Sequence, residues 1–181
     1  RHPSNFSGAV ADLFAQDADV NVVHPFNRLQ GPDAYYNDFL RPLQHAFEGL
    51  FRRDDIVMSG QFEGQHWISS TGYYVGRFAR NWIGLKATDT LCYLRYGEFH
   101  RIEDGKAIES YIYLDIPELM IACNQWPLVM GPGLSRGYTG LIQGPASRDG
   151  VISTSPDPAD GERSYQIVTE MLGALATNDE A

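Results

Sequence analysis

Residues 90–120, TLCYLRYGEFHRIEDGKAIESYIYLDIPELM, form the stretch that decides the expected fold. It contains two runs, 90–102 and 106–115, that are rich in aromatic and β-branched residues with partial alternation, as β-strands are. The triplet Glu-Asp-Gly at 103–105 lies between these runs and is a turn signal. The stretch therefore predicts an antiparallel hairpin that is followed by a short helix.

The part of the chain before this hairpin adds helices first and further strands later. Apolar residues recur at near-helical spacing in the early segments, and Pro42 inside the second predicted helix indicates a kink or a boundary there. The expected elements are helices at 6–15 and 30–50, a brief strand at 20–25, and strands at 52–64 and 65–78 with a Glu-Gly turn between them. Helices followed by an antiparallel meander predict an α+β fold with the helices packed on one sheet face.

The overall composition is that of an ordinary globular domain with an acidic surface. The chain has 181 residues, 43% of them hydrophobic, and a formal net charge of −9. This charge argues against nucleic-acid binding, which needs clustered Lys and Arg, and no apolar run is long enough to span a membrane. Neither the two cysteines nor the five histidines have metal-binding spacing, so we expect no metal, no cofactor and a cytoplasmic protein.

The carboxy-terminal part differs from the rest of the chain. Residues 126–162 are rich in proline and glycine with little periodicity, which indicates an extended linker or arm after a domain at 1–125. An amphipathic helix is expected in the last segment, 163–181. The absence of a starting methionine suggests a trimmed chain or a fragment, and this helix fits the beginning of a second, truncated domain.

One face of the last predicted strand carries residue types that suit acid/base chemistry. Because side chains alternate along a strand, Glu109, Tyr111, Tyr113 and Asp115 share a face. A carboxylate beside phenols in a cavity can take a proton from the carbon next to a carbonyl, while a phenol O–H stabilises the enolate oxygen. Asp115 also fits the first position of a capping box with Glu118, and the residues alone favour this capping role.

Several segments resemble the SnoaL-like polyketide cyclases of the NTF2-like superfamily. The runs 71–90 and 95–120 are similar to the family's Thr-Gly-x-His-x-Gly strand, Gly-Ile-Pro-x-Thr-Gly loop, Asp-Gly-Lys-Ile turn, and Asp before a leucine-rich helix. Residues 31–50 also look like a helix of this family, whereas Tyr74 stands where the family's strand has its pocket histidine. The resemblance implies a cone-shaped barrel, in which a curved antiparallel sheet wraps on helices around a pocket, and a homodimer.

The resemblance also implies a function. In the family an Asp is the acid/base of an intramolecular aldol closure, and Asp115 looks like the corresponding position here. We therefore predict a polyketide (ester) cyclase-type enzyme with a small, hydrophobic or aromatic, carbonyl-containing substrate; the alternative is a non-catalytic ligand-binding or dimerisation module. The predicted catalytic residues are Asp115, Tyr74 and His24, and the predicted substrate-binding residues are Tyr111, Tyr113, Trp82, Arg95 and Phe39.

Overall fold

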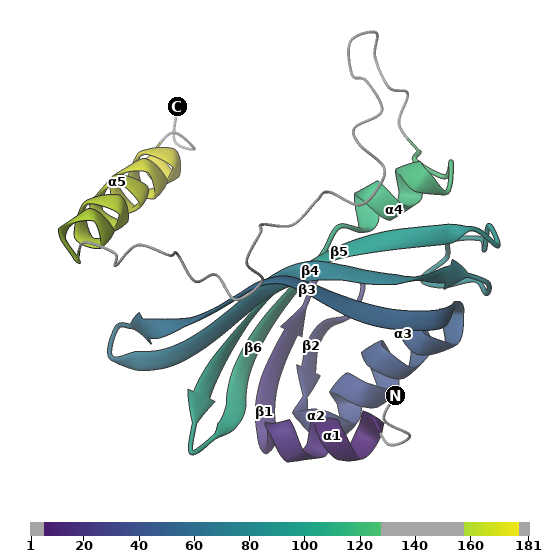
Figure 1. Cartoon of the computed structure of the whole chain (residues 1–181), viewed down its shortest axis with the longest axis horizontal. Helices are drawn as coiled ribbons and strands as arrows, with labels where there is room; N and C mark the ends of the chain where they lie inside the picture. Colours follow the sequence, from purple (N-terminus) through teal and green to yellow (C-terminus); the bar gives the residue numbers. More distant parts are fainter. Residues whose placement is uncertain (1–5, 128–157, 178–181) are drawn as a thin grey trace, which may run out of the picture. The chain divides into compact units, whose positions relative to one another are not determined.

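The computed structural model describes residues 6–127 and 158–177, which belong to two separate units, 1–150 and 151–181 (Figure 1). The first unit contains a mixed sheet with short helices, and the second contains one long helix. In chain order the elements are α1 (Phe6–Leu13), β1 (Phe14–Val22), β2 (Asn27–Gln30), α2 (Gly31–Ala34), the π-helical segment η1 (Tyr35–Leu40), α3 (Arg41–Ala46), β3 (Phe47–Phe62), β4 (Gln65–Phe78), β5 (Leu91–Glu103), β6 (Lys106–Leu114), α4 (Ile116–Ala122) and α5 (Pro158–Thr177). Most of the linker predicted at 126–162 lies outside the described residues.

The sheet has six strands in the order β2-β1-β6-β5-β4-β3. Neighbouring strands are antiparallel except β1 and β6, which are parallel. The two predicted hairpins are confirmed, and their two-residue turns, Glu63-Gly64 and Asp104-Gly105, have positive φ at both positions, as type I′ turns do. The expected α+β fold with a curved sheet is therefore confirmed, with one parallel pair that the sequence did not indicate.

Helices α1 to α3 cover the concave face of the sheet (Figure 1). The second predicted helix ends at Ala46 rather than at residue 50, because Phe47 already pairs with Phe78 as the start of β3. Pro42 does not end the helix. It occupies the first turn of α3, directly after the π-helical segment, so the boundary expected near Pro42 is a change of helix type.

The core lies between the concave face and these helices. Alternate residues of β5 and β6 point into it and are almost fully buried, among them Leu94, Tyr96, Glu98, Ser110 and Ile112. Glu98 and Ser110 stand out as polar residues beside a hydrophobic core cluster. The alternation predicted for both strands is thus confirmed, and the structure shows which side of each strand is inside.

A β-bulge in β3 separates two neighbouring aspartates. The pairing register with β4 shifts between Asp54 and Ile56, so Asp55 is the extra residue. Gly72, the partner of Asp54, is required at this point, because a Cβ there would overlap the backbone carbonyl of Arg53. The bulge leaves Asp54 hydrogen-bonded to the core side of β5.

Two kinds of feature are absent from residues 6–127 and 158–177. No helix in these ranges is both long and apolar enough to cross a membrane. The same residues contain no group of three or more His, Cys, Asp or Glu side chains placed to hold a metal ion.

Candidate functional site

A cavity of about 690 Å³ opens between the start of β3, the helical segment η1–α3 and β4; we call it the η1–β3 cavity. Its wall combines aromatic and aliphatic side chains with a small number of polar groups, and both this composition and the volume are usual for small-molecule sites. The residues that line it include Tyr35, Leu40, Gln44, Phe47, Arg52 and Tyr74.

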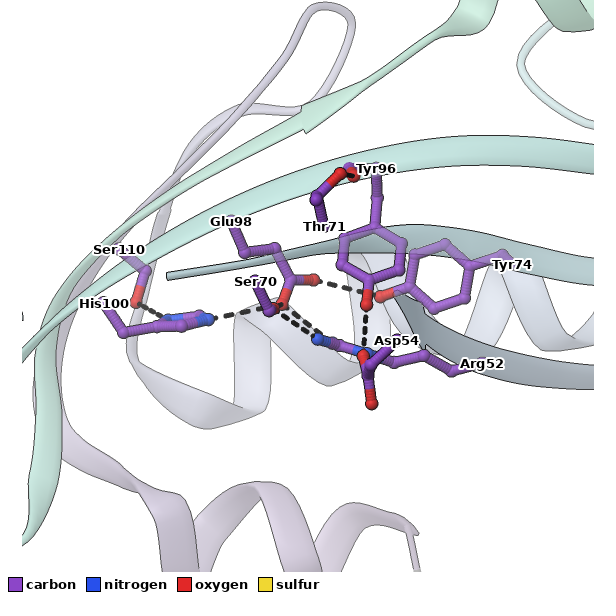
Figure 2. A network of polar contacts seen from close by, with 9 residues as sticks. All are labelled: Arg52, Asp54, Ser70, Thr71, Tyr74, Tyr96, Glu98, His100 and Ser110. Atoms are coloured by element: carbon purple, nitrogen blue, oxygen red, sulfur yellow. Dashed lines mark hydrogen bonds and ion pairs between the residues drawn. The ribbon is translucent and has the colours of Figure 1, made fainter. Parts of the chain in front are cut away.

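Glu98 holds the polar side of this cavity together (Figure 2). Only 1% of Glu98 is exposed, and its Oε2 lies 2.7 Å from Arg52 Nη1 and 3.3 Å from His100 Nε2. Tyr74 donates its hydroxyl proton to Glu98 Oε1 at 3.2 Å. Two cavity-lining side chains, Arg52 and Tyr74, are thus fixed around the buried charge of Glu98. We call the whole group the polar network; its members are Arg52, Asp54, Tyr74, Tyr96, Glu98 and His100.

Asp54 is the second carboxylate of the polar network and the more accessible one. Its Oδ1 accepts hydrogen bonds from Arg52 Nε at 2.7 Å and from the Tyr96 hydroxyl. Its Oδ2 makes no hydrogen bond within the described residues and points away from the other members in Figure 2. Asp54 thus has one oxygen that is held by hydrogen bonds and one that is free, and 44% of its side chain is exposed. A carboxylate with a free, accessible oxygen can accept a proton.

Both carboxylates are held in the ionised form. Burial alone would raise the pKa of Glu98, but the hydrogen bond with His100 and the charge of Arg52 outweigh it, and the pKa lies below its ordinary value. Burial likewise opposes ionisation of Asp54, and the hydrogen bonds from Tyr96 and Arg52 outweigh it, so this pKa is lowered too. The site therefore contains two negative charges next to one guanidinium at neutral pH.

The phenols beside these carboxylates shift in the opposite direction. Burial, and after it the negative charge of Glu98, raises the pKa of Tyr35 and of Tyr74 well above the ordinary value. For Tyr96 the causes of the raised pKa are burial and the hydrogen bond to Asp54. All three hydroxyl groups therefore keep their protons over the physiological pH range.

Ser110, His100 and Glu98 are connected in the order of a catalytic triad. Ser110 Oγ lies 2.8 Å from His100 Nδ1, and the other ring nitrogen faces Glu98. A nucleophilic serine must reach its substrate, whereas Ser110 is 0% exposed and does not line the η1–β3 cavity. The arrangement orients His100 toward Glu98 and offers no accessible nucleophile.

Of the three predicted catalytic residues, Tyr74 lines the η1–β3 cavity. Asp115 is the N-cap of α4, where its Oδ1 accepts the backbone N–H of Glu118 at 2.9 Å, and it is not a cavity-lining residue. His24 is exposed in the turn between β1 and β2, where a cis peptide bond joins it to Pro25. The capping role of Asp115 is confirmed, and a catalytic role of Asp115 or His24 stays a prediction.

Three predicted substrate-binding residues, Tyr111, Tyr113 and Arg95, lie on the outer face of the sheet. The buried side of β6 is formed instead by residues such as Ser110 and Ile112. This corrects the expectation that Tyr111 and Tyr113 share a cavity with Tyr74, because strand alternation sends them to the opposite side.

A second hollow, of about 580 Å³, lies on this outer face and is largely aromatic; we call it the outer hollow. The rings of Trp67 and Tyr111 stack across it with centroids 6.4 Å apart, and several neighbours are about half exposed. Its lining includes Met58, Phe62, Trp67, Phe99, Tyr111 and Tyr113.

Phe39 and Trp82 are core residues behind the wall of the η1–β3 cavity. Phe39 packs on Tyr35 with ring centroids 5.6 Å apart, and Trp82 packs on Phe47 at 6.0 Å. Each supports an aromatic side chain that lines the cavity. Direct contact of either residue with a substrate stays a prediction.

Sequence reasoning did not identify Arg52, Asp54, Tyr35 or Glu98 as site residues. The alternation Arg52-x-Asp54 at the start of a predicted strand is a usable signal, because it puts opposite charges on one side. Tyr35 is one of two adjacent tyrosines in a predicted helix, and the pattern does not distinguish them.

Comparison with known proteins identifies the fold. No family model matches the sequence, and no curated protein matches it significantly.

Among solved structures, a candidate SnoaL-like polyketide cyclase from Jannaschia sp. CCS1 has a TM-score of 0.57 and 15% identity, and the match covers 69% of this chain and 82% of that protein. IdmH, a candidate polyketide cyclase from Streptomyces antibioticus, has a TM-score of 0.54 and 14% identity, covering 67% and 88%. An NTF2-like protein from Burkholderia thailandensis E264 has a TM-score of 0.50 and 17% identity, covering 68% and 85%. The chain therefore has the NTF2-like fold, in the form that is also found in SnoaL-like polyketide cyclases.

Proposed function

We propose that the chain is a cyclase-type enzyme that binds a small, hydrophobic or aromatic carbonyl compound in the η1–β3 cavity and transfers a proton there. The observation that carries this proposal is that two members of the polar network, Arg52 and Tyr74, form part of the cavity wall, and both contact the buried Glu98. A binding module of the same fold needs the cavity, but it has no need of an ionised carboxylate with a free oxygen next to it. We therefore favour catalysis over binding alone.

Asp54, which is bonded to the cavity-lining Arg52 but is not itself a lining residue, is the proposed base. Its free oxygen takes the proton from the carbon next to the carbonyl, and the electron pair of the broken C–H bond forms the enolate. In a ring closure the enolate carbon attacks a second carbonyl group of the same molecule. The new alkoxide then takes the proton back from Asp54, so the carboxylate is regenerated.

Asp115 is the other candidate for this role, because it looks like the family's acid/base position. Capping uses its Oδ1, which leaves the second oxygen for chemistry. Asp54 and Asp115 make opposite predictions for the same substitution, and one assay can therefore decide between them.

Deuterium uptake by 1-tetralone in D₂O, followed by NMR, measures proton transfer next to a carbonyl group. We expect the wild-type protein to accelerate the exchange and Asp54→Asn to reduce this acceleration ~100-fold, which is the usual contribution of a general base. Asp115→Asn should keep the rate within about twofold, because Asn also caps helices well.

The reverse pattern in this assay would assign the base to Asp115. If wild-type protein bound 1-tetralone without accelerating the exchange, the proposed chemistry would be wrong and the binding-module alternative would be supported. A control with Glu103→Gln, an exposed carboxylate at the end of β5, should behave as wild type.

We also propose that the protein is a homodimer in which a second copy covers the outer hollow. Large apolar side chains gather there at exposures of about half, including Met58, Phe62, Phe99 and Tyr113. Contiguous exposed apolar patches of this kind on a protein surface usually mark an interaction site.

A further inference from the structure

We propose that the Tyr35 hydroxyl is the hydrogen-bond donor that binds the carbonyl oxygen of the ligand. This inference rests on the proposed function, because it names the group that recognises the carbonyl in the same cavity. Tyr35 comes from the helical side, as the first residue of η1, whereas Arg52 and Tyr74 come from strands. The ligand would thus be held between an element that binds its oxygen and a sheet that carries the charges.

Tyr35 is a buried residue whose hydroxyl makes no hydrogen bond within the described residues. Only 4% of the residue is exposed, and its ring packs on Phe14 and Phe39 at centroid distances of 5.1 and 5.6 Å. Its oxygen keeps some accessible surface, so it is not a fully enclosed atom. The phenol hydroxyl of a buried tyrosine usually has a hydrogen-bond partner. Because Tyr35 lines the η1–β3 cavity, we expect its partner inside that cavity.

The chemistry of Tyr35 suits it to the role of donor. Burial and the nearby charge of Glu98 raise its pKa, so the phenol stays protonated. Its two aromatic neighbours fix the ring, which limits the positions that the hydroxyl can reach. A protonated phenol in apolar surroundings stabilises both a carbonyl oxygen and the more negative enolate oxygen that forms from it.

The other polar groups of the cavity wall are less suited to this role. Tyr74 already donates its single hydroxyl proton to Glu98, so it offers the cavity only lone pairs. Each nitrogen of the Arg52 guanidinium is engaged by a carboxylate or a hydroxyl group. Gln44 is only partly buried and Arg80 is exposed, so water can satisfy the donors of both. Tyr35 is therefore the buried residue of the wall whose hydroxyl proton is not taken by a group of the described residues.

The test compares wild type and Tyr35→Phe in binding two probes, 1-tetralone and tetralin, which has the same ring system without the carbonyl group. We expect the variant to bind 1-tetralone about tenfold more weakly, as befits one lost neutral hydrogen bond, and to bind tetralin as before. The infrared C=O band of bound 1-tetralone should lie at a lower wavenumber in wild type than in Tyr35→Phe, because a hydrogen bond weakens the C=O bond.

Tyr36→Phe is the matched control, since it removes a phenol hydroxyl from the same helical segment but not from the cavity wall. It should leave both affinities and the C=O band unchanged. Thermal unfolding separates structure from recognition. Tyr35→Phe should not lower the melting temperature of the free protein, whereas Tyr74→Phe should, because Glu98 then loses a donor.

An unchanged C=O band and an unchanged affinity for 1-tetralone in Tyr35→Phe would overturn this inference and leave the proposed function standing. Equal weakening of 1-tetralone and tetralin would also overturn it, since Tyr35 would then act through packing alone. If wild-type protein bound neither probe, the proposed function would fail, and this inference with it.

Discussion

Glu98 determines the behaviour of the site, because it is a negative charge with almost no access to water. Removing a carboxylate from water costs several kcal/mol, and that cost is offset only by good partners. Arg52, Tyr74 and His100 supply them from three strands. The same contacts that stabilise the charge also position Arg52 and Tyr74 at the cavity wall, so stability and preorganisation have one origin here.

Replacement of Glu98 by Gln should change how stability depends on pH. Since the pKa of Glu98 is lower in the folded than in the unfolded chain, its contribution is complete above the unfolded pKa and is lost as pH falls through the folded one. We therefore expect wild type to lose more stability than Glu98→Gln between neutral and acidic pH. Urea unfolding at a series of pH values measures this difference.

Glu103→Gln is the control for this measurement, because it removes an exposed carboxylate from the same strand. Its pH dependence should follow that of wild type. At neutral pH, Glu98→Gln should be less stable than wild type by about 2–4 kcal/mol, since Arg52 loses its buried counter-charge. Identical acid profiles for Glu98→Gln and wild type would show that Glu98 is not the ionised centre of the network.

At the residue scale, the sequence predicted strand faces but not their orientation. Strand alternation puts Tyr96, Glu98 and His100 on one side of β5, and they share it in the structure. Tyrosine suits a cavity wall and a half-exposed surface equally well, because its ring is apolar and its hydroxyl is polar. The pattern of β6 therefore could not tell that Tyr111 and Tyr113 lie outside.

The bulge in β3 is the element that brings Asp54 to the polar network. Its geometry requires Gly72, since a Cβ at that position would overlap the Arg53 carbonyl. We expect Gly72→Ala to lower the free energy of unfolding by about 1–3 kcal/mol, as overpacking does. It should also reduce the deuterium exchange of 1-tetralone, because Asp54 is displaced.

Gly97→Ala is the matched control on the neighbouring strand, where a Cβ would meet nothing within 4 Å. Urea unfolding should show little change for this variant. Equal effects of the two alanines on stability would mean that the bulge tolerates a side chain, and the geometric account of Asp54 would then fail.

At the element scale, the residues of the turns made the hairpins predictable. The ends of helices and strands were not predictable. The Glu-Gly and Asp-Gly turns mark both hairpins in the sequence, and the structure has them there. Phe47 continues the apolar stripe of the helix and fits the first position of a strand equally well. Only pairing with β4, a tertiary interaction, decides between the two.

The proposed homodimer is tested at the scale of the whole molecule. Phe99→Glu places a charge in the outer hollow, and we expect it to weaken self-association more than tenfold, because a buried unpaired charge at an interface is costly. Leu13→Glu is the control, as it alters an exposed leucine that does not line the hollow. Sedimentation equilibrium of the three proteins measures the effect.

A wild-type protein that remains a monomer at high concentration would contradict the homodimer. If both variants dissociated equally, the interface would not be the outer hollow. Neither result would affect the η1–β3 cavity, which lies within one chain.

The fold as a whole was predictable from the order of loose motifs, but the site was not. Its wall is assembled from η1, the beginning of β3 and the middle of β4, with Glu98 behind it on β5. The segment η1 and the beginning of β3 are close in the sequence, whereas Tyr74 and Glu98 lie further along the chain, and no segment carries a motif of its own. Their meeting depends on sheet curvature, on the bulge, and on where the helix ends, which are properties of the folded chain.

The most direct test of the central claim is a crystal structure of the protein with 1-tetralone. We expect the ring system in the η1–β3 cavity, with the carbonyl oxygen within ~3.2 Å of the Tyr35 hydroxyl. Density for the probe in the outer hollow alone, or none in the η1–β3 cavity at saturating concentration, would contradict it.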